Sequence, residues 1–253
     1  MRSLILWTLL LFSTAALAAE TRLVVRARAR DGKFVGTSMG GVRVVLRDAQ
    51  SGQVLASGIT SGSTGNTQTL MKQPQARGAS LADESSAKFT ATLDITEPQL
   101  VTVEVSGPLA QRQALATSTT QLWLLPGKHL EGDGLILELP GFVVDVLAPS
   151  AHEFFKLAGD RKLTIPLRAN LILMCGCPTE PKGLWDSNRY TLQATVKHNG
   201  KPLTQFPLKY TGKTSTFEGA LSVQQRGAYE VTVTAFDPVT GNAGVDSTTF
   251  VVE

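Results

Sequence analysis

After residue 20 the sequence has almost no helical periodicity. Short runs rich in Val, Leu, Thr and Ile are separated by Gly, Pro, Asp and Asn, a pattern typical of antiparallel sandwiches. About seven such runs precede the pair Pro140-Gly141, and about seven follow it. We therefore expect an all-β protein of two tandem antiparallel β-sandwich domains, residues 20–140 and 141–253.

The first 19 residues have the pattern of a secretory signal peptide. A positive residue, Arg2, precedes an apolar run from Leu4 to Phe12, and small residues follow as far as Ala18 and Ala19. The apolar run is too short to span a bilayer comfortably, and no later segment is long and apolar enough to do so. We expect residues 1–19 to be cleaved and the mature chain to be periplasmic or secreted, without a transmembrane segment.

Charge and cysteine content argue against a nucleic-acid-binding protein and against a scaffold held by disulfides. The net charge of +3 is spread along the chain, without the clustered basic stripe that a phosphate backbone requires, so we expect no nucleic-acid partner. The two cysteines are Cys175 and Cys177, and one short-range pair cannot staple two domains. The cores must therefore depend on apolar packing, which 42% hydrophobic residues can supply.

One long segment and two tryptophans stand apart from the strand pattern. Residues 61–87 are rich in Gly, Ser, Thr, Gln and Ala, and a loop this long inside a compact domain is either functional or disordered. Its composition favours a mobile surface segment over a binding lid. Trp123 lies in an apolar run and is expected in the core. Trp185 lies in a loop and is a candidate for contact with a partner.

A stretch of the first domain matches the pattern of a known sandwich module. The matching residues are Asp31-Gly32, Gly41-Val42-Arg43-Val44, Asp48, Ser51-Gly52-Gln53-Val54-Leu55-Ala56, Ile59-Thr60, Gly62 and Gly65. This stretch resembles a carboxypeptidase-regulatory-like, transthyretin-like domain, although the aromatic strand usual after the second glycine is replaced by the 61–87 loop. The resemblance implies an extracytoplasmic sandwich that supports folding, adhesion or partner contact.

The C-terminal strands run through Gly227-Ala228-Tyr229-Glu230-Val231-Thr232-Val233-Thr234-Ala235-Phe236-Asp237 and continue after Gly241-Asn242. This segment resembles the last strand pair of bacterial immunoglobulin-like modules. The resemblance implies that Tyr229 closes the end of the sandwich as a corner residue, which is a structural role. Earlier in the same domain, Asn199-Gly200 predicts a tight hairpin turn because both residues tolerate positive φ.

The sharpest motif is Met174-Cys175-Gly176-Cys177-Pro178, where an apolar strand runs into a loop. Residues two apart on a strand project from the same face, and Gly176 lets the backbone tighten, so both sulfurs come within reach of one ion or of each other. Three interpretations stay open. In the first, Met174, Cys175 and Cys177 bind a soft ion such as Cu(I). In the second, the two cysteines form a disulfide that exchanges with a partner. In the third, they are buried small hydrophobic residues or a passive local disulfide.

The remaining polar residues give no catalytic motif. His129, His152 and His198 show no ligand spacing with one another and are expected to be solvated loop residues. Asp94 and Glu97, which bracket a strand end, are interpreted as turn and surface residues. The sequence also contains no Gly-x-Ser-x-Gly elbow and no P-loop.

These patterns favour a non-enzymatic binding or adaptor protein that contacts another exported or envelope protein through loops at the sandwich ends. In one version the loop of Cys175 and Cys177 holds Cu(I), the one cofactor we consider. The alternatives are a thiol-disulfide redox protein that uses the same two cysteines and a purely structural or adhesive module.

Overall fold

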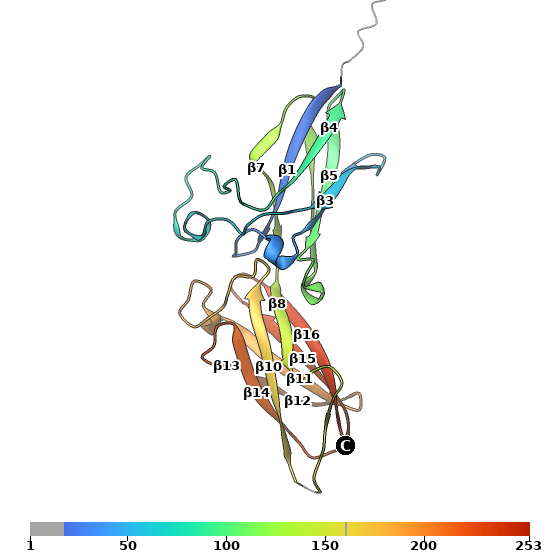
Figure 1. Ribbon diagram of the computed structural model, residues 1–253, viewed down its shortest axis with the longest axis vertical. Coiled ribbons are helices and arrows are strands. Elements are labelled where there is room, and N and C mark those ends of the chain that lie inside the picture. The colour runs from blue at the N-terminus through green and yellow to red at the C-terminus, as the bar shows by residue number, and fades with distance from the viewer. Residues whose placement is uncertain (1–17, 160) are drawn as a thin grey trace, which may run out of the picture.

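The computed structural model describes residues 18–159 and 161–253, and in them the chain is almost entirely β (Figure 1). Residues 1–17 of the expected signal peptide lie outside the described residues. The N-terminal half contains β1 Ala19–Ala29, β2 Arg43–Asp48, β3 Val54–Ile59, β4 Phe89–Ile95, β5 Gln99–Gly107, β6 Ala116–Leu124 and β7 Leu130–Leu139. The C-terminal half contains β8 Phe142–Ala148, β9 Glu153–Phe155, β10 Leu163–Leu173, β11 Thr191–His198, β12 Lys201–Pro207, β13 Lys209–Tyr210, β14 Thr216–Val223, β15 Gly227–Phe236 and β16 Ala243–Val252. Short 3₁₀ helices cover Thr37–Met39, Arg112–Ala114 and Ser187–Arg189, and Gln68–Lys72 forms a single π-helical turn.

Two sheets make up the N-terminal half, with strand orders β4-β1-β7 and β3-β2-β5-β6. The pairing of β1 with β7 is parallel, and the other pairings in these two sheets are antiparallel. Side chains alternate along each strand, so one face of each sheet is apolar and packs inward. On β5, for example, Val101, Val103 and Val105 are fully buried in the core.

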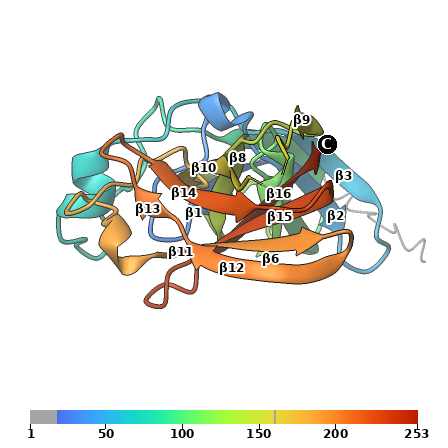
Figure 2. The same ribbon diagram turned by 90° about the horizontal axis from the view of Figure 1, so that it is seen from below.

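The C-terminal half is a second pair of sheets, with orders β13-β14-β10-β8 and β12-β11-β15-β16-β9. Figure 2, seen from the C-terminal end of the molecule, shows β14 and β10 on one side and β11, β12 and β15 on the other. Alternate residues of β10 from Ile165 to Leu173 are buried between the sheets. The all-β class and the sandwich architecture expected from the sequence are therefore confirmed.

Two local expectations in the C-terminal half are confirmed. Asn199 and Gly200 adopt φ values of 48° and 77° and join β11 to β12 as a tight hairpin. The Tyr229 hydroxyl donates a hydrogen bond to the Gln225 carbonyl at 2.7 Å, and its ring stacks on Phe250 with centroids 4.9 Å apart. Tyr229 is thus a buried corner residue that ties the start of β15 to the preceding turn.

The expectation that Trp123 belongs to the core is wrong. Its side chain is 60% exposed, because the alternation along β6 places Leu122 and Leu124 toward the interior and Trp123 on the outer face of the sheet. An apolar run does not show that each of its residues is buried, because only every second residue of a sandwich strand faces the core.

The segment 61–87 extends to one side of the N-terminal half (teal in Figure 1) and is held by a buried arginine. Arg26 on β1 is 2% exposed, and its guanidinium donates to the carbonyl groups of Ser86, Ala87, Gly132 and Asp133. These bonds anchor the end of the segment to β1 and to the residues at the start of β7. This end of the segment is thus attached to the sandwich, and the expectation of a mobile surface segment stays a prediction.

Residues 80–82 of the segment are attached by a carboxylate. Asp133 accepts hydrogen bonds from the backbone N–H groups of Leu81 and Ala82 at 2.9 Å and 2.8 Å and from the Ser80 hydroxyl at 2.8 Å. Burial opposes ionisation of Asp133, but the two backbone N–H groups and Ser80 lower its pKa overall. Arg26 and Asp133 together attach the last residues of the segment, 80–87, to the N-terminal sandwich.

Candidate functional site

The motif Cys175-Gly176-Cys177 forms a disulfide loop at the end of β10. The two sulfurs are bonded to each other, with the Cα atoms 5.3 Å apart. Gly176, between them, has a φ of +77°, and its N–H donates to the Leu173 carbonyl at 2.8 Å. Both cysteines are almost completely buried, at 2% and 3% exposure. The sequence motif has therefore folded as a compact, oxidised turn.

This disulfide loop packs directly against the N-terminal half. A Cβ placed on Gly32 would lie 3.1 Å from Cys175 Sγ and 3.3 Å from Leu173 Cδ2, so the absence of a side chain there allows the close approach. On the other side of the turn, a Cβ placed on Gly176 would lie 2.9 Å from Met39 Sδ. Met39 ends the 3₁₀ helix of the N-terminal half and is buried. The loop is thus held by both halves of the chain.

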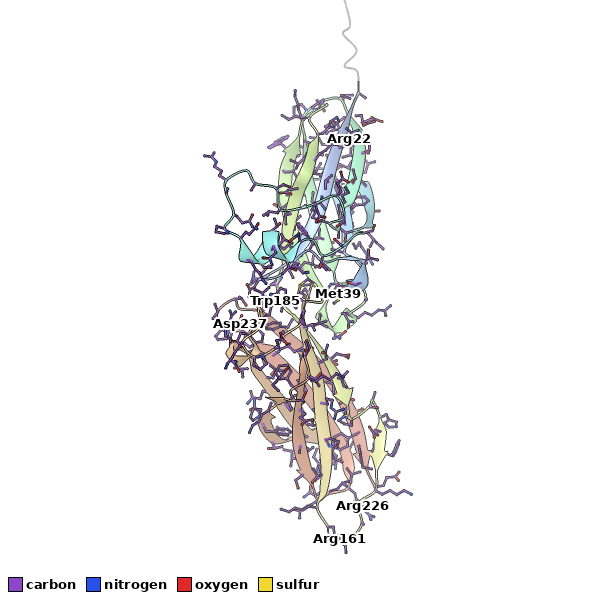
Figure 3. All side chains as sticks on the ribbon, turned by 60° about the vertical axis from the view of Figure 1, so that its left-hand side comes forward. Arg22, Met39, Arg161, Trp185, Arg226 and Asp237 are labelled. Carbon is purple, nitrogen blue, oxygen red and sulfur yellow. A yellow bond between two sulfur atoms is a disulfide. The ribbon has the colours of Figure 1, made fainter. Side chains whose placement is uncertain are left out.

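Polar contacts surround the same junction, and Figure 3 shows Met39, Trp185 and Asp237 together at the waist of the molecule. The Trp185 indole N–H donates to the Asp31 carbonyl at 2.7 Å. The Arg189 guanidinium lies 2.8 Å from Asp237 Oδ2 and 3.5 Å from Asp31 Oδ2. Arg189 therefore joins a carboxylate of each half.

The pKa values of the two junction carboxylates, Asp31 and Asp237, shift in opposite directions. Burial raises the pKa of Asp31, although Arg189 opposes the shift. Burial also opposes ionisation of Asp237, but the Val239 N–H and the Arg189 guanidinium lower its pKa overall. The hydrogen bond to Asp237 in turn raises the pKa of Arg189. Asp237 is therefore the stronger anionic partner of Arg189.

Asn242 fixes the linker between the halves. Its side-chain oxygen accepts from the Gly141 N–H at 2.8 Å, and its amide nitrogen donates to the Arg30 carbonyl at 3.1 Å. Asn242 is 1% exposed, so both bonds are shielded from water. A third bond, from Gln113 Nε2 to the Val144 carbonyl at 3.1 Å, crosses the junction on another side. Apolar packing, ion pairs and these hydrogen bonds therefore hold the two halves together, beside a pocket of about 460 Å³ that residues of both halves line.

The predicted ligand set is only partly brought together. Cys175 and Cys177 are bonded to each other, while the methyl group of Met174 packs at the linker residue Gly141. Among the described residues no three His, Cys, Asp or Glu side chains form a group that could hold a metal ion. In the oxidised state the cysteines offer no thiolate, so a Cu(I) site at Met174, Cys175 and Cys177 stays a prediction about the reduced protein.

Trp185 was expected to contact a partner. In the structure it is 6% exposed and bound to the N-terminal half of its own chain, so contact with a different protein stays a prediction. No local sequence pattern marks Asp31, Met39 or Asn242, because each meets its partners only in the folded chain.

The three histidines have separate local surroundings. His129 Nδ1 accepts from the Arg22 N–H at 3.1 Å in the N-terminal half. In the C-terminal half, His152 packs edge-on against Phe154, and His198 stacks on Tyr229 with centroids 4.6 Å apart. The described contacts give these histidines packing and hydrogen-bonding roles.

A second candidate site lies at the opposite end of the N-terminal half, beside the exposed Trp123. A pocket of about 470 Å³ is formed there by the turn after β2, the turn between β4 and β5, and β6. Its polar lining residues and the tryptophan are Asp48, Gln50, Asp94, Thr96, Glu97, Gln99 and Trp123. The lining is therefore mostly polar, and Trp123 supplies its large aromatic surface.

Asp48 makes one wall of this pocket rigid. Its carboxylate accepts from the Ser51 N–H at 2.6 Å, from the Gln50 N–H at 3.1 Å and from Gln99 Nε2 at 3.0 Å. The Ser51 N–H, followed by the Gln99 side chain, lowers the pKa of Asp48 to about 2. Asp94 and Glu97, in contrast, have no hydrogen bond or ion pair from their side chains within the described part of the chain. Their carboxylates remain available to a ligand.

No protein-family model matches the chain, and no curated protein matches its sequence. Among solved structures, an engineered protein aligns with a TM-score of 0.33 at 16% identity, over 51% of this chain and 24% of its own. Fibronectin(III)-like modules of Clostridium thermocellum CbhA align with a TM-score of 0.29 at 11% identity, over 83% of this chain and 77% of theirs. A titin fragment of three immunoglobulin domains aligns with a TM-score of 0.25 at 11% identity, over 94% of this chain and 66% of its own. The chain thus spans about a quarter of the engineered protein and about two thirds of the titin fragment. The fold assignment depends on the sheets described above.

No helix in residues 18–159 or 161–253 combines the length and apolar character needed to cross a bilayer.

Proposed function

We propose that the protein is an exported, periplasmic, non-enzymatic binding module of two tandem sandwich domains, residues 20–140 and 141–253, with its binding site in the Trp123 pocket. The observation that carries this proposal is the 60% exposure of Trp123 at the edge of a pocket of about 470 Å³. A tryptophan has a large apolar surface that gains free energy when a ligand covers it. The first sandwich would be carboxypeptidase-regulatory-like and the second immunoglobulin-like.

The chemistry of the lining favours a positively charged ligand. Asp48, Asp94 and Glu97 contribute carboxylates, and the lining contains no Lys, Arg or His. A Lys or Arg side chain laid over the Trp123 ring would gain a cation–π interaction as well as contact with these carboxylates. The partner is therefore a basic segment of another exported or envelope protein.

The position of the pocket fits this role. It lies at the outer end of the N-terminal half, where Ile95 pairs with Ala19, and the C-terminal half meets the opposite end (Figure 1). Loops at the end of a sandwich can bind a partner without disturbing the sheets that hold them. The closed junction keeps the second sandwich at a fixed distance from the bound partner.

Defined peptides test the proposal. Isothermal titration would compare Lys- and Arg-containing peptides with matched Ala peptides on the wild type, Trp123→Ala and, as a control on the same face of β6, Thr119→Ala. We expect saturable, salt-sensitive binding of the basic peptides and a loss of about tenfold in Trp123→Ala, the size of a partly desolvated cation–π contact. Absence of saturable binding, or equal binding by Trp123→Ala, would refute the proposal.

A second candidate function is Cu(I) binding by the reduced protein, and the specific observation that favours it is the place of Met39. Its thioether sulfur lies beside Gly176, the residue between the two cysteines in sequence. The thioether would add a soft ligand to the two thiolates. Titration of reduced protein with Cu(I) against a chromophoric chelator tests this function. We expect stoichiometric Cu(I) in the wild type and none in Cys175→Ser/Cys177→Ser, and chelator that keeps all the copper would exclude it.

A further inference from the structure

We propose that the Cys175–Cys177 disulfide is a redox-controlled lock on the junction. In the oxidised protein the two halves keep one arrangement, and reduction by a dithiol releases them from it. The proposal concerns the junction alone and is independent of the ligand in the Trp123 pocket. Three observations carry it: the width of the disulfide loop, the contacts of the loop with Gly32 and Met39, and the burial of both cysteines.

The disulfide sets the width of the turn. The two Cα atoms are 5.3 Å apart, whereas residues two apart in an extended strand are about 7 Å apart. Once the bond is broken, the two sulfurs must separate to a non-bonded distance, and Gly176 permits the backbone to widen. Reduction therefore allows the loop to widen against the residues that pack directly on it.

Both flanks of the loop face the N-terminal half. Cys175 Sγ lies against Gly32, and the backbone at Gly176 lies against Met39 Sδ. The contacts are close enough that even a Cβ at either glycine would press on its neighbour. A wider loop therefore pushes on Gly32 and Met39, and Gly32 follows Asp31, whose carbonyl accepts the hydrogen bond from the Trp185 indole.

Burial couples reduction to opening of the junction. The cysteines are 2% and 3% exposed, and Cys175 Sγ lies against Gly32 of the N-terminal half, so separation of the halves gives an attacking thiolate access to that sulfur. That thiolate then forms a mixed disulfide with one cysteine while the other leaves as a thiolate. The second thiol of the reductant displaces the first cysteine, which gives two protein thiols and one oxidised dithiol. Opening therefore speeds reduction, and the wider loop left after reduction favours the open arrangement because it no longer fits against Gly32 and Met39.

The first experiment measures the rate at which dithiothreitol reduces the native protein. Trp185→Phe keeps an aromatic ring but loses the N–H that binds Asp31, and Trp123→Phe is the matched control in the distant pocket. We expect Trp185→Phe to be reduced about fivefold to tenfold faster, the equivalent of one buried hydrogen bond, and Trp123→Phe to match the wild type. Equal rates in all three proteins would overturn the proposal.

The second experiment measures the arrangement of the halves directly. Residual dipolar couplings would be recorded for the oxidised wild type, the reduced wild type and Cys175→Ser/Cys177→Ser, with each half fitted separately to show that it is folded. We expect one common alignment tensor in the oxidised protein and two different tensors in the reduced and Ser forms. A common tensor in every form, or two tensors already in the oxidised protein, would overturn the lock.

Discussion

Replacing Arg26 by Met tests how the 61–87 segment is held. Arg26 is 2% exposed and donates to four main-chain carbonyl groups, and two of those bonds, to Ser86 and Ala87, are buried. Arg26→Met keeps an unbranched side chain but leaves these buried carbonyls without that donor. An unpaired buried acceptor costs about 1–3 kcal/mol, and bonds from a charged donor are stronger than average. We therefore expect the free energy of unfolding to fall by about 2–5 kcal/mol.

Urea denaturation of Arg26→Met and of the control Arg43→Met measures this loss. Arg43 lies on the exposed face of β2, so its replacement should change stability by less than about 0.5 kcal/mol. Limited trypsin digestion gives a local readout, because Lys72 and Arg77 lie exposed within the segment. We expect faster cleavage there in Arg26→Met before global unfolding. A stability loss below about 1 kcal/mol together with unchanged cleavage would show that other contacts hold the segment.

Three further outcomes are expected. Tyr229→Phe removes a hydrogen bond to a main-chain carbonyl and should lower the free energy of unfolding in urea by about 1 kcal/mol, whereas Tyr210→Phe should change it less. The pKa of Asp48 is lowered in the folded protein from 3.8 to about 2, so the stability it contributes is present above pH 4 and lost as the pH falls through 2. Thermal unfolding across that range should be less acid-sensitive in Asp48→Asn than in the wild type, and equal sensitivity would contradict this assignment. Replacing both Cys175 and Cys177 by Ser should cost no more than about 2 kcal/mol in urea, because such a short loop restrains the unfolded chain little. A loss above about 4 kcal/mol would show that the disulfide supports the fold itself.

The architecture could be predicted because its signals are local. Alternating apolar residues on β10, the turn residues Asn199 and Gly200, and the corner residue Tyr229 each act through neighbours close in sequence or through the regular geometry of a sheet. The sandwich class follows from such patterns, whereas the order of the strands within the sheets does not. The division at Pro140-Gly141 was argued from the same evidence.

The sites were predicted less well because their signals are either ambiguous or non-local. Trp123 was assigned to the core from its apolar neighbours, although the alternation through Gln121 already placed it outward. Arg26 interrupts an apolar strand, and that interruption was a usable sign of a buried hydrogen-bonding role. The junction residues Asp31 and Asn242 carry no such sign, because only the folded chain brings them together.

Asn242 has a consequence for the order in which the protein assembles. It binds Gly141 and Arg30, which lie 101 and 212 residues earlier in the chain. The strands of the N-terminal half are complete once residue 139 is available, but the junction needs the turn that follows β15. During vectorial synthesis or translocation, the first sandwich can therefore fold while its attachment to the second is still missing. The loop around Cys175 and Cys177 emerges in this interval, before Asn242 is available to fix the linker. The cysteines thus have a period in which oxidants can reach them, and that period ends when the last strands arrive.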